Sequence, residues 1–351
     1  MKNIFLSAAV AALMIFPSCN KYEAVPSEQQ AKKVSIDVSI VSGATSTKAS
    51  GTVNTTTAEY HSTAEQRVNN LQVFVFRDDV LDGYASVDNS ASTSVECTAG
   101  TRDIYCLVNA PATLGSTVSK SALLAAVSEL AENPTNFEMV GISTEKNLSS
   151  GGDTDIEVPV SRLASKIVIK GIENSLRTGK PMKISRIYIS NVAGQVNYGL
   201  DVHSPADGKW YNKGGYQASN NLGSFTQDLG LSADVANGAT YSTNHYFYAY
   251  PNDNPQVNHS GTWTPKRTML VVQIDYDGKL YDYPIDLGVD LEPNKMYVLN
   301  NLKLVNLGNP DDGEEGGDDE ENPVSGSTVQ VSVDIVDWSL VLLGTDGEIT
   351  I

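Results

Sequence analysis

The chain has 351 residues, with 42 acidic and 24 basic side chains and a formal net charge of −18. That length allows two domains, each with a hydrophobic core of its own. The negative charge argues against nucleic acid and against anionic lipid headgroups as direct partners, because both would be repelled. Eight of the acidic residues lie between positions 311 and 321, so the rest of the chain is only moderately acidic.

Residues 1–19 have the features of a bacterial export signal. Lys2 supplies a positive charge, residues 4–16 form an apolar segment too short to span a bilayer, and Ser18 precedes Cys19. A cysteine at this place is typical of a lipoprotein, in which Cys19 is acylated and becomes the first mature residue. An ordinary secretory signal with a nearby cleavage site is the alternative.

Residues 33–41 predict a strand with one apolar face, which consists of Val34, Ile36, Val38 and Ile40. Residues 42–66 are rich in Thr, Ser and Gly, so we expect them to be exposed and accessible to proteases. Lys48 is the single basic residue in this stretch, and the next, Arg67, lies at the edge of a strand. We therefore expect processing at Lys48, with Arg67 as the alternative.

Alternating apolar residues predict further strands at 70–77, 102–109, 137–142 and 156–172, the last long enough for two strands. One helix is expected at 116–131, where Leu123, Val127 and Leu130 form an apolar stripe and Ser116 or Thr117 caps the start. In the second half, strands are expected at 182–192, 246–250, 268–276, 279–286 and 296–304. Many short strands and one helix indicate an all-β fold of sandwich domains.

Two cysteines other than Cys19 flank a turn in the first half of the chain. Cys97 and Cys106 could face each other as a hairpin disulfide in an oxidising compartment. Two separate buried thiols are an equally good interpretation, because unpaired cysteine is often part of a core.

The C-terminal segment begins with the acidic, glycine-broken run at 310–322, which we expect to be a solvated, extended tether. After it the alternation predicts one or two strands, with a bulge or bend after Ile335. Their apolar face consists of Val329, Val331, Val333, Ile335, Trp338, Leu340 and Leu342. The sequence VSVDI at 331–335 matches VSIDV at 34–38, so the two segments could occupy the same place in a sheet. The alternative is that half-buried strands share this pattern in general.

No combination of residues predicts catalysis or a cofactor. His61, His203, His245 and His259 lack metal-ligand spacing, and there is no nucleophile elbow or phosphate-binding glycine loop. Asp275, Asp277 and Gly278 resemble a fragment of a calcium loop but are better explained as a hairpin turn. We therefore expect no enzyme activity, no metal and no cofactor.

Several stretches together resemble the fimbrillin family, the FimA-type subunits of type V pili in Bacteroidales. The leader that ends at Cys19 and the C-terminal strand with Trp338 belong to this pattern. The others are residues 71–76, IYCLVNAP at 104–111, FEMVG at 137–141, SRLASKIVI at 161–169, YAYPN at 248–252 and PNKMYVLNNLKL at 293–304. Their order extends over nearly the whole mature chain.

The resemblance implies two transthyretin-like β-sandwich domains, export to the outer membrane as a lipoprotein, and removal of an N-terminal strand by a protease. A C-terminal strand of a neighbouring subunit would then take the vacated place. The implied partners are other pilin subunits, including anchor and tip subunits, and the processing protease. Family members are typically cut after arginine, whereas the matching position here is Lys48.

These expectations divide the chain into six parts. The parts are a signal peptide at 1–19, a propeptide with the removable strand at 20–48, domains at 49–162 and 163–309, an acidic linker at 310–325 and the donor strand or strands at 326–351.

The alternative to a pilus subunit is a monomeric surface lipoprotein that binds glycan or host protein, with its C-terminal strand folded onto its own domain.

Overall fold

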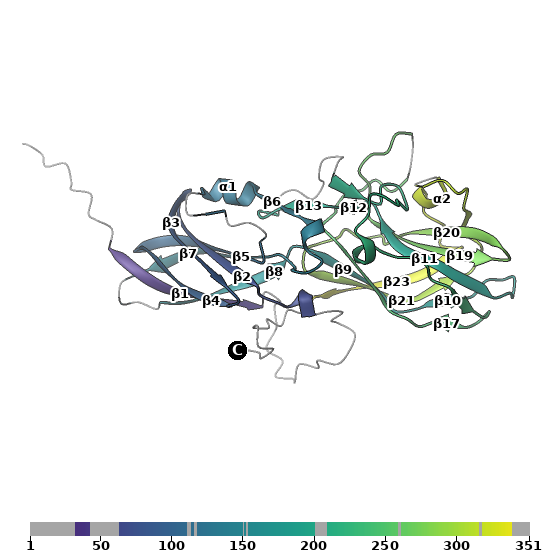
Figure 1. Ribbon diagram of the computed structural model, residues 1–351, viewed down its shortest axis with the longest axis horizontal. Helices are drawn as coiled ribbons and strands as arrows, with labels where there is room; N and C mark the ends of the chain where they lie inside the picture. The colour runs from purple at the N-terminus through teal and green to yellow at the C-terminus, as the bar shows by residue number, and fades with distance from the viewer. Residues whose placement is uncertain are drawn as a thin grey trace, which may run out of the picture.

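The computed structural model describes residues 32–42, 63–110, 114–115, 118–149, 151, 154–200, 209–258, 261–315 and 318–338. The molecule is elongated, with two β-rich parts placed end to end (Figure 1). Nearly all of its regular structure is β, which confirms the predicted fold class. In the part of the chain that is described, no helix is long and apolar enough to cross a membrane.

The first part is built on one seven-stranded sheet in the order β3-β2-β5-β7-β8-β1-β4. The alternation in β2 explains why both faces of this sheet are covered. Leu71, Val73 and Val75 belong to the hydrophobic cluster that also contains the apolar residues of β1. Phe74 and Phe76, on the opposite face, belong to the cluster that extends into the second part. The strands are β1 (Lys33–Ser42), β2 (Asn70–Arg77), β3 (Val80–Asp88), β4 (Ser92–Thr98), β5 (Gly100–Val108), β7 (Met139–Leu148) and β8 (Asp155–Arg162).

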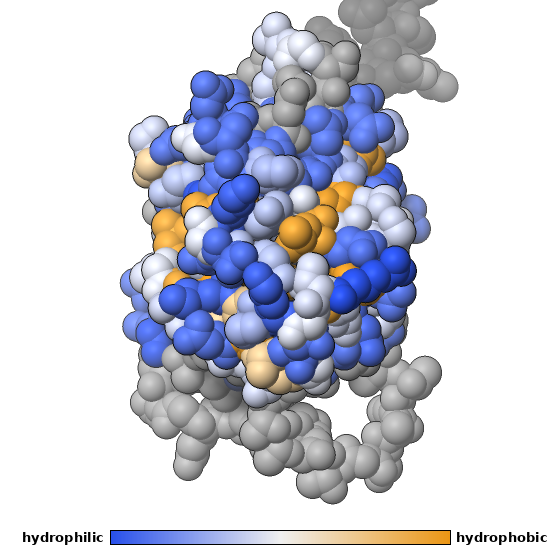
Figure 2. Space-filling model, turned by 90° about the vertical axis from the view of Figure 1, so that its right-hand side faces the viewer, coloured by the Kyte–Doolittle hydropathy of each residue, from blue (hydrophilic) through white to orange (hydrophobic). Residues whose placement is uncertain are grey.

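The second part is a sandwich of two six-stranded sheets. One sheet contains β9 (Ser165–Ile169), β10 (Ile172–Asn174), β17 (Thr240–Tyr241), β18 (His245–Ala249), β21 (Lys295–Leu304) and β23 (Val329–Asp337). The other contains β11 (Met182–Ser190), β15 (Gln227–Asp228), β16 (Ala233–Val235), β19 (Met269–Tyr276), β20 (Lys279–Asp286) and β22 (Asn309–Pro310). A short ladder pairs β12 (Val192–Ala193) with β14 (Trp210–Tyr211). At the end of the molecule that this part forms, apolar patches are small and separated by hydrophilic side chains (Figure 2).

The helix predicted at 116–131 is wrong in length. The structure has α1 (Lys120–Ala125), capped by the Ser119 hydroxyl, which accepts from the amide of Ala122. After Ala126 the chain becomes β6 (Val127–Glu129), which pairs with β13 (Gln195–Asn197) of the second part. Leu123 and Leu130 are buried as expected, but Val127 is 49% exposed. Pairing between the two parts therefore replaces the second half of the expected helix.

The acidic run is not the extended tether that its composition predicts. It contains β22 and α2 (Asp318–Glu321), and three of its carboxylates are buried: Asp319, Glu320 and Glu321. Glu320 accepts hydrogen bonds from the Tyr188 hydroxyl at 2.7 Å and from the Tyr216 amide at 3.1 Å. The run is thus folded against the second sandwich, where residues distant in sequence donate hydrogen bonds to Glu320.

Candidate functional site

β1 lies inside its sheet, with a neighbour on each edge. It pairs in parallel with β8 and antiparallel with β4, so its backbone is bonded on both sides. The four predicted apolar side chains of β1 are no more than 8% exposed. Burying four such side chains stabilises the sheet by about 6–12 kcal/mol. We call the place between β8 and β4 the β1 slot.

The β1 slot is a core position rather than an edge position. Val95 and Cys97 on β4 and Val158 and Val160 on β8 are buried in the same hydrophobic cluster as β1. Along the chain, β1 is joined to the rest of the protein only through residues 43–62. Lys48 lies in that segment, outside the described residues, as does Cys19 in the leader. One cut between 43 and 62 would therefore leave β1 held by noncovalent contacts alone.

Arg67 has an exposed side chain but a restrained backbone. The Asn109 side-chain amide donates to the carbonyl oxygen of Arg67 at 2.7 Å and to that of Phe137 at 2.9 Å. The neighbouring Val68 is 1% exposed. A protease needs several residues in an extended, accessible conformation, so cutting at Arg67 would require local unfolding of this core.

β23 is folded onto its own chain, antiparallel to β21. Val329 is 6% exposed, Val331 and Val333 are half-buried, and Ile335 is 49% exposed. The strand is continuous through Asp337, so the bulge or bend expected after Ile335 is absent from it. The register of its pairing with β21 shifts instead between Asn300 and Lys303 of β21. Leu340 and Leu342 lie outside the described residues. The apolar face of β23 is thus less buried on β21 than the face of β1 is in its slot.

The aligned aspartates of β1 and β23 have equivalent roles in their two sheets. Asp37 accepts a hydrogen bond from the Ser94 hydroxyl of the adjacent strand β4. Asp334 accepts one from the Asn300 side-chain amide of the adjacent strand β21, at 2.7 Å. Each carboxylate lies on the exposed face of its strand. The sequence match therefore extends to the way the two strands present their polar faces.

A buried polar cluster joins the segment before β2 to the end of β23. We call it the junction cluster, and it consists of Glu65, Arg162, Lys166, Tyr248 and Trp338. The Glu65 carboxylate accepts from the Lys166 ammonium at 2.9 and 3.0 Å, from the Tyr248 hydroxyl at 2.5 Å and from the Trp338 indole at 3.3 Å. Burial, and then the charge of Glu65, raise the pKa of Tyr248 well above its usual value.

Arg162 completes the junction cluster at the connection between the two parts. Its guanidinium donates to the carbonyl oxygens of Glu65 at 2.7 Å and of Trp338 at 3.0 Å, and it stacks 4.2 Å from the centre of the Trp338 ring. Glu65, Lys166 and Trp338 are fully buried. The end of β23 is therefore attached to the segment that follows residues 43–62, through charge-assisted hydrogen bonds that are strong in a dry interior.

Trp338 is predicted from the sequence as an apolar donor-strand residue, whereas the other residues of the junction cluster are not predicted. One signal was available: Arg162 and Lys166 interrupt an apolar stretch, and buried cations require a partner. Glu65 could not be identified as that partner, because it lies about a hundred residues before Lys166 in the sequence.

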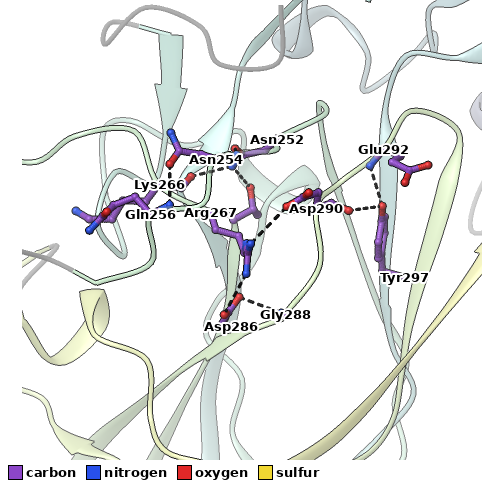
Figure 3. A network of polar contacts seen from close by, with 11 residues as sticks. Asn252, Asn254, Gln256, Lys266, Arg267, Asp286, Gly288, Asp290, Glu292 and Tyr297 are labelled. Atoms are coloured by element: carbon purple, nitrogen blue, oxygen red, sulfur yellow. Dashed lines mark hydrogen bonds and ion pairs between the residues drawn. The ribbon is translucent and has the colours of Figure 1, made fainter.

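The turn that leads into β21 is fixed by a second polar network (Figure 3). Arg267 lies 3.4 Å from a carboxylate oxygen of Asp286 and 3.4 Å from one of Asp290. The Tyr297 hydroxyl donates to the Asp290 carbonyl and accepts from the Glu292 amide, both at 2.7 Å. This turn carries Asn294, whose carbonyl accepts from the backbone amide of Trp338 at 3.0 Å. The network thus positions the acceptor that holds the end of β23.

The remaining predicted residues form no site in the part of the chain that is described. Cys97 and Cys106 are separate buried thiols, and burial raises their pKa values to about 11 and about 12. His245 is buried between Asp228, at 2.9 Å, and the Tyr241 hydroxyl, at 3.1 Å, and burial lowers its pKa. His61, His203 and His259 lie outside the described residues.

Comparisons with known proteins agree with this architecture. Residues 33–186 match the model of a family described as "Major fimbrial subunit protein (FimA)". No curated protein matches the chain. A family of structural subunits agrees with the expectation that this chain is not an enzyme.

Solved structures show the same fold at low sequence identity. A candidate cell adhesion protein of Bacteroides eggerthii is 20% identical, with a TM-score of 0.57 over 88% of this chain and 97% of that one. A second, from Parabacteroides distasonis, is 19% identical, with a TM-score of 0.55 over 89% and 98%. A fimbrilin of Porphyromonas gingivalis is 14% identical, with a TM-score of 0.54 over 88% and 98%. The family match and the shared fold confirm the resemblance of this chain to the FimA-type fimbrillin family.

Proposed function

We propose that the protein is a structural subunit of a cell-surface fimbrium that supports adhesion and polymerises by strand exchange. The observation that carries this proposal is the β1 slot, an interior place in a sheet whose occupant is joined to the chain through one segment. After proteolysis β1 leaves, and the C-terminal strand of a neighbouring subunit enters between β8 and β4. The family description and the fimbrilin fold support the subunit role.

The difference in burial between the two strand positions favours exchange. In the slot, four alternate side chains are buried, whereas on β21 only Val329 of the corresponding face of β23 is fully buried. Burying the rest of that face would contribute about 1.5–3 kcal/mol for each side chain that is still exposed. An empty slot would expose an apolar face and two strand edges, so keeping β1 in place until assembly avoids aggregation.

Processing at Lys48 fits the geometry better than processing at Arg67. The Arg67 backbone is held by Asn109 and precedes the buried Val68. A cut at Lys48 would release β1 and leave Glu65 with its partners. Lipidation of Cys19 would hold the precursor at the outer membrane until this cut. N-terminal sequencing of the surface form tests both proposals, since it distinguishes mature starts at Cys19, Ala49 and Val68.

The second candidate function is that of a monomeric surface lipoprotein that binds glycan or host protein. The observation that favours it is that β23 is folded onto its own β21, with Trp338 fixed by the junction cluster. Under this alternative the strand stays in place after proteolysis.

A reversible cross-link of β23 to β21 separates the two functions. Lys295 and Asp337 are cross-strand neighbours whose side chains lie 2.6 Å apart. The variant Lys295→Cys with Asp337→Cys, oxidised and then cut after Lys48, is expected to remain monomeric and to form SDS-resistant ladders only after reduction. The single variant Lys295→Cys is the control and should polymerise under both conditions. Polymers from the oxidised double variant would show that β23 need not leave its own domain.

A further inference from the structure

Three aspartates from separate places in the chain meet where the acidic run packs on β20. Asp282 is on β20, Asp311 follows β22, and Asp319 is in α2. One carboxylate oxygen of each lies within 4.8 Å of the others. Asp282 is fully buried and Asp319 is 7% exposed. A group of carboxylates this close together and this dry requires compensation of its charge.

Asp282 has an oxygen that the protein leaves unsatisfied. Its Oδ1 is buried and has no hydrogen-bond partner among the residues that are described. The Gln273 side-chain amide donates to Oδ2 of Asp282 at 3.4 Å and to Oδ2 of Asp311 at 2.8 Å, but not to Oδ1 of Asp282. A buried carboxylate oxygen without a donor is costly, so Oδ1 of Asp282 points to a ligand that is not a protein side chain.

The charges around the cluster do not balance. Arg186 lies 3.6 Å from Asp311 Oδ2, and the buried carboxylate of Glu320 adds another negative charge nearby. The three aspartates therefore have one guanidinium within ion-pair distance among the described residues. A divalent cation would offset this excess of negative charge.

We propose that Asp282, Asp311 and Asp319 bind a calcium ion. Calcium takes oxygen ligands at about 2.3–2.6 Å in flexible geometry, so oxygens up to about 5 Å apart can share one ion. The separations among the three carboxylates fall within that limit. Backbone amides already orient two of the ligands, since Gly313 donates to Asp311 at 2.7 Å and Asp312 donates to Asp319 at 3.0 Å.

The ion would fasten the acidic run to β20, just ahead of β23. It would add to the hydrogen bonds from Tyr188 and Tyr216 that already hold this run against the second sandwich. Carboxylate sites of extracellular modules bind calcium with dissociation constants of about 10⁻⁴–10⁻³ M. The inference does not depend on the proposed assembly, since it concerns the folding of the run in a single chain.

Calorimetric titration of the full chain with CaCl₂, after treatment with a chelator, tests the proposal. The expected result is one ion per chain with a dissociation constant of about 10⁻⁴–10⁻³ M. Asp282→Asn should weaken binding at least tenfold. Glu314→Gln removes the same charge from an exposed place in the same run and should change the affinity less than twofold. Circular dichroism confirms folding, and if Asp282→Asn is not folded, Asp311→Asn provides the comparison at a less buried ligand.

Three results would overturn the assignment. The first is the absence of calcium binding by the wild-type chain at 10 mM, about ten times the weakest expected dissociation constant. The second is equal weakening by Glu314→Gln and Asp282→Asn, which would indicate diffuse attraction by the acidic run. The third is magnesium binding as tight as calcium binding, which would exclude a site selective for the larger ion.

Discussion

Replacing Glu65 by Gln is the most informative change to the junction cluster. The substitution keeps the shape of the side chain but removes the charge that lies 2.9 Å from the Lys166 ammonium, where both groups are fully buried. Breaking a buried ion pair from one side costs about 3–5 kcal/mol, because the remaining charge has no counterion. The free energy of unfolding of Glu65→Gln should therefore fall by about that amount in a urea titration followed by tryptophan fluorescence.

A double variant and a surface control make this prediction sharper. Lys166→Met together with Glu65→Gln removes both charges and should recover much of the loss, because a neutral pair avoids the unpaired ion. Glu157→Gln, at an exposed position on β8, should change the free energy of unfolding by less than about 0.5 kcal/mol. A loss below about 1 kcal/mol in Glu65→Gln would refute the view that the junction cluster holds the segment before β2 and the end of β23 together.

Two further changes test the β1 slot and the contact between the two parts of the molecule. Ile36→Ala should destabilise the uncut precursor by about 2–5 kcal/mol in a denaturant titration, and should leave the stability of protein already cut after Lys48 and assembled unchanged. An equal effect on both forms would contradict the removal of β1. Glu138 is buried and accepts from the Tyr198 hydroxyl at 2.6 Å, and burial raises its pKa from 4.5 to about 7. The folded protein therefore binds this proton more tightly than the unfolded chain, so its contribution to stability is complete below pH 4.5 and is lost as the pH rises through 7. Glu138→Gln should raise the free energy of unfolding by about 1–3 kcal/mol at pH 8 and by almost nothing at pH 4; the same gain at both pH values would refute this explanation.

Local patterns in the sequence predict the strands well, because apolar and polar residues alternate along a strand that has one buried face. β2 has the predicted limits and the predicted two faces, and all four apolar residues of β1 are buried. Strands β3 and β4, which form the two ends of the seven-stranded sheet, were missed because Val80 to Thr98 carries weak alternation with many polar residues on its exposed face.

Features that depend on distant partners could not be read from the sequence. Val127 to Glu129 has helical periodicity but pairs with β13 of the other sandwich. The acidic run is folded because Tyr188, Tyr216 and β20 contact it, and none of these is close in sequence. Glu65 in a polar stretch shows no sign of its burial, which comes from Lys166 and Trp338. In each case a tertiary contact decides the local structure.

In the proposed assembly, the C-terminal strand of one subunit occupies the β1 slot of another. The alignment of VSVDI with VSIDV places Asp334 where Asp37 lies, opposite Ser94 of β4. The variant Ser94→Cys with Asp334→Cys, cut after Lys48 and oxidised, should therefore give polymers joined by disulfides between chains. The uncut precursor, whose slot is occupied by β1, is the control and should give none.

The measurement is gel electrophoresis of these oxidised polymers after boiling in SDS, with and without a reducing agent. We expect a ladder that persists on boiling without the reducing agent and collapses to monomer when boiled with it. Polymers that carry no disulfide between chains, or the same cross-links in the uncut precursor, would contradict strand exchange through the β1 slot.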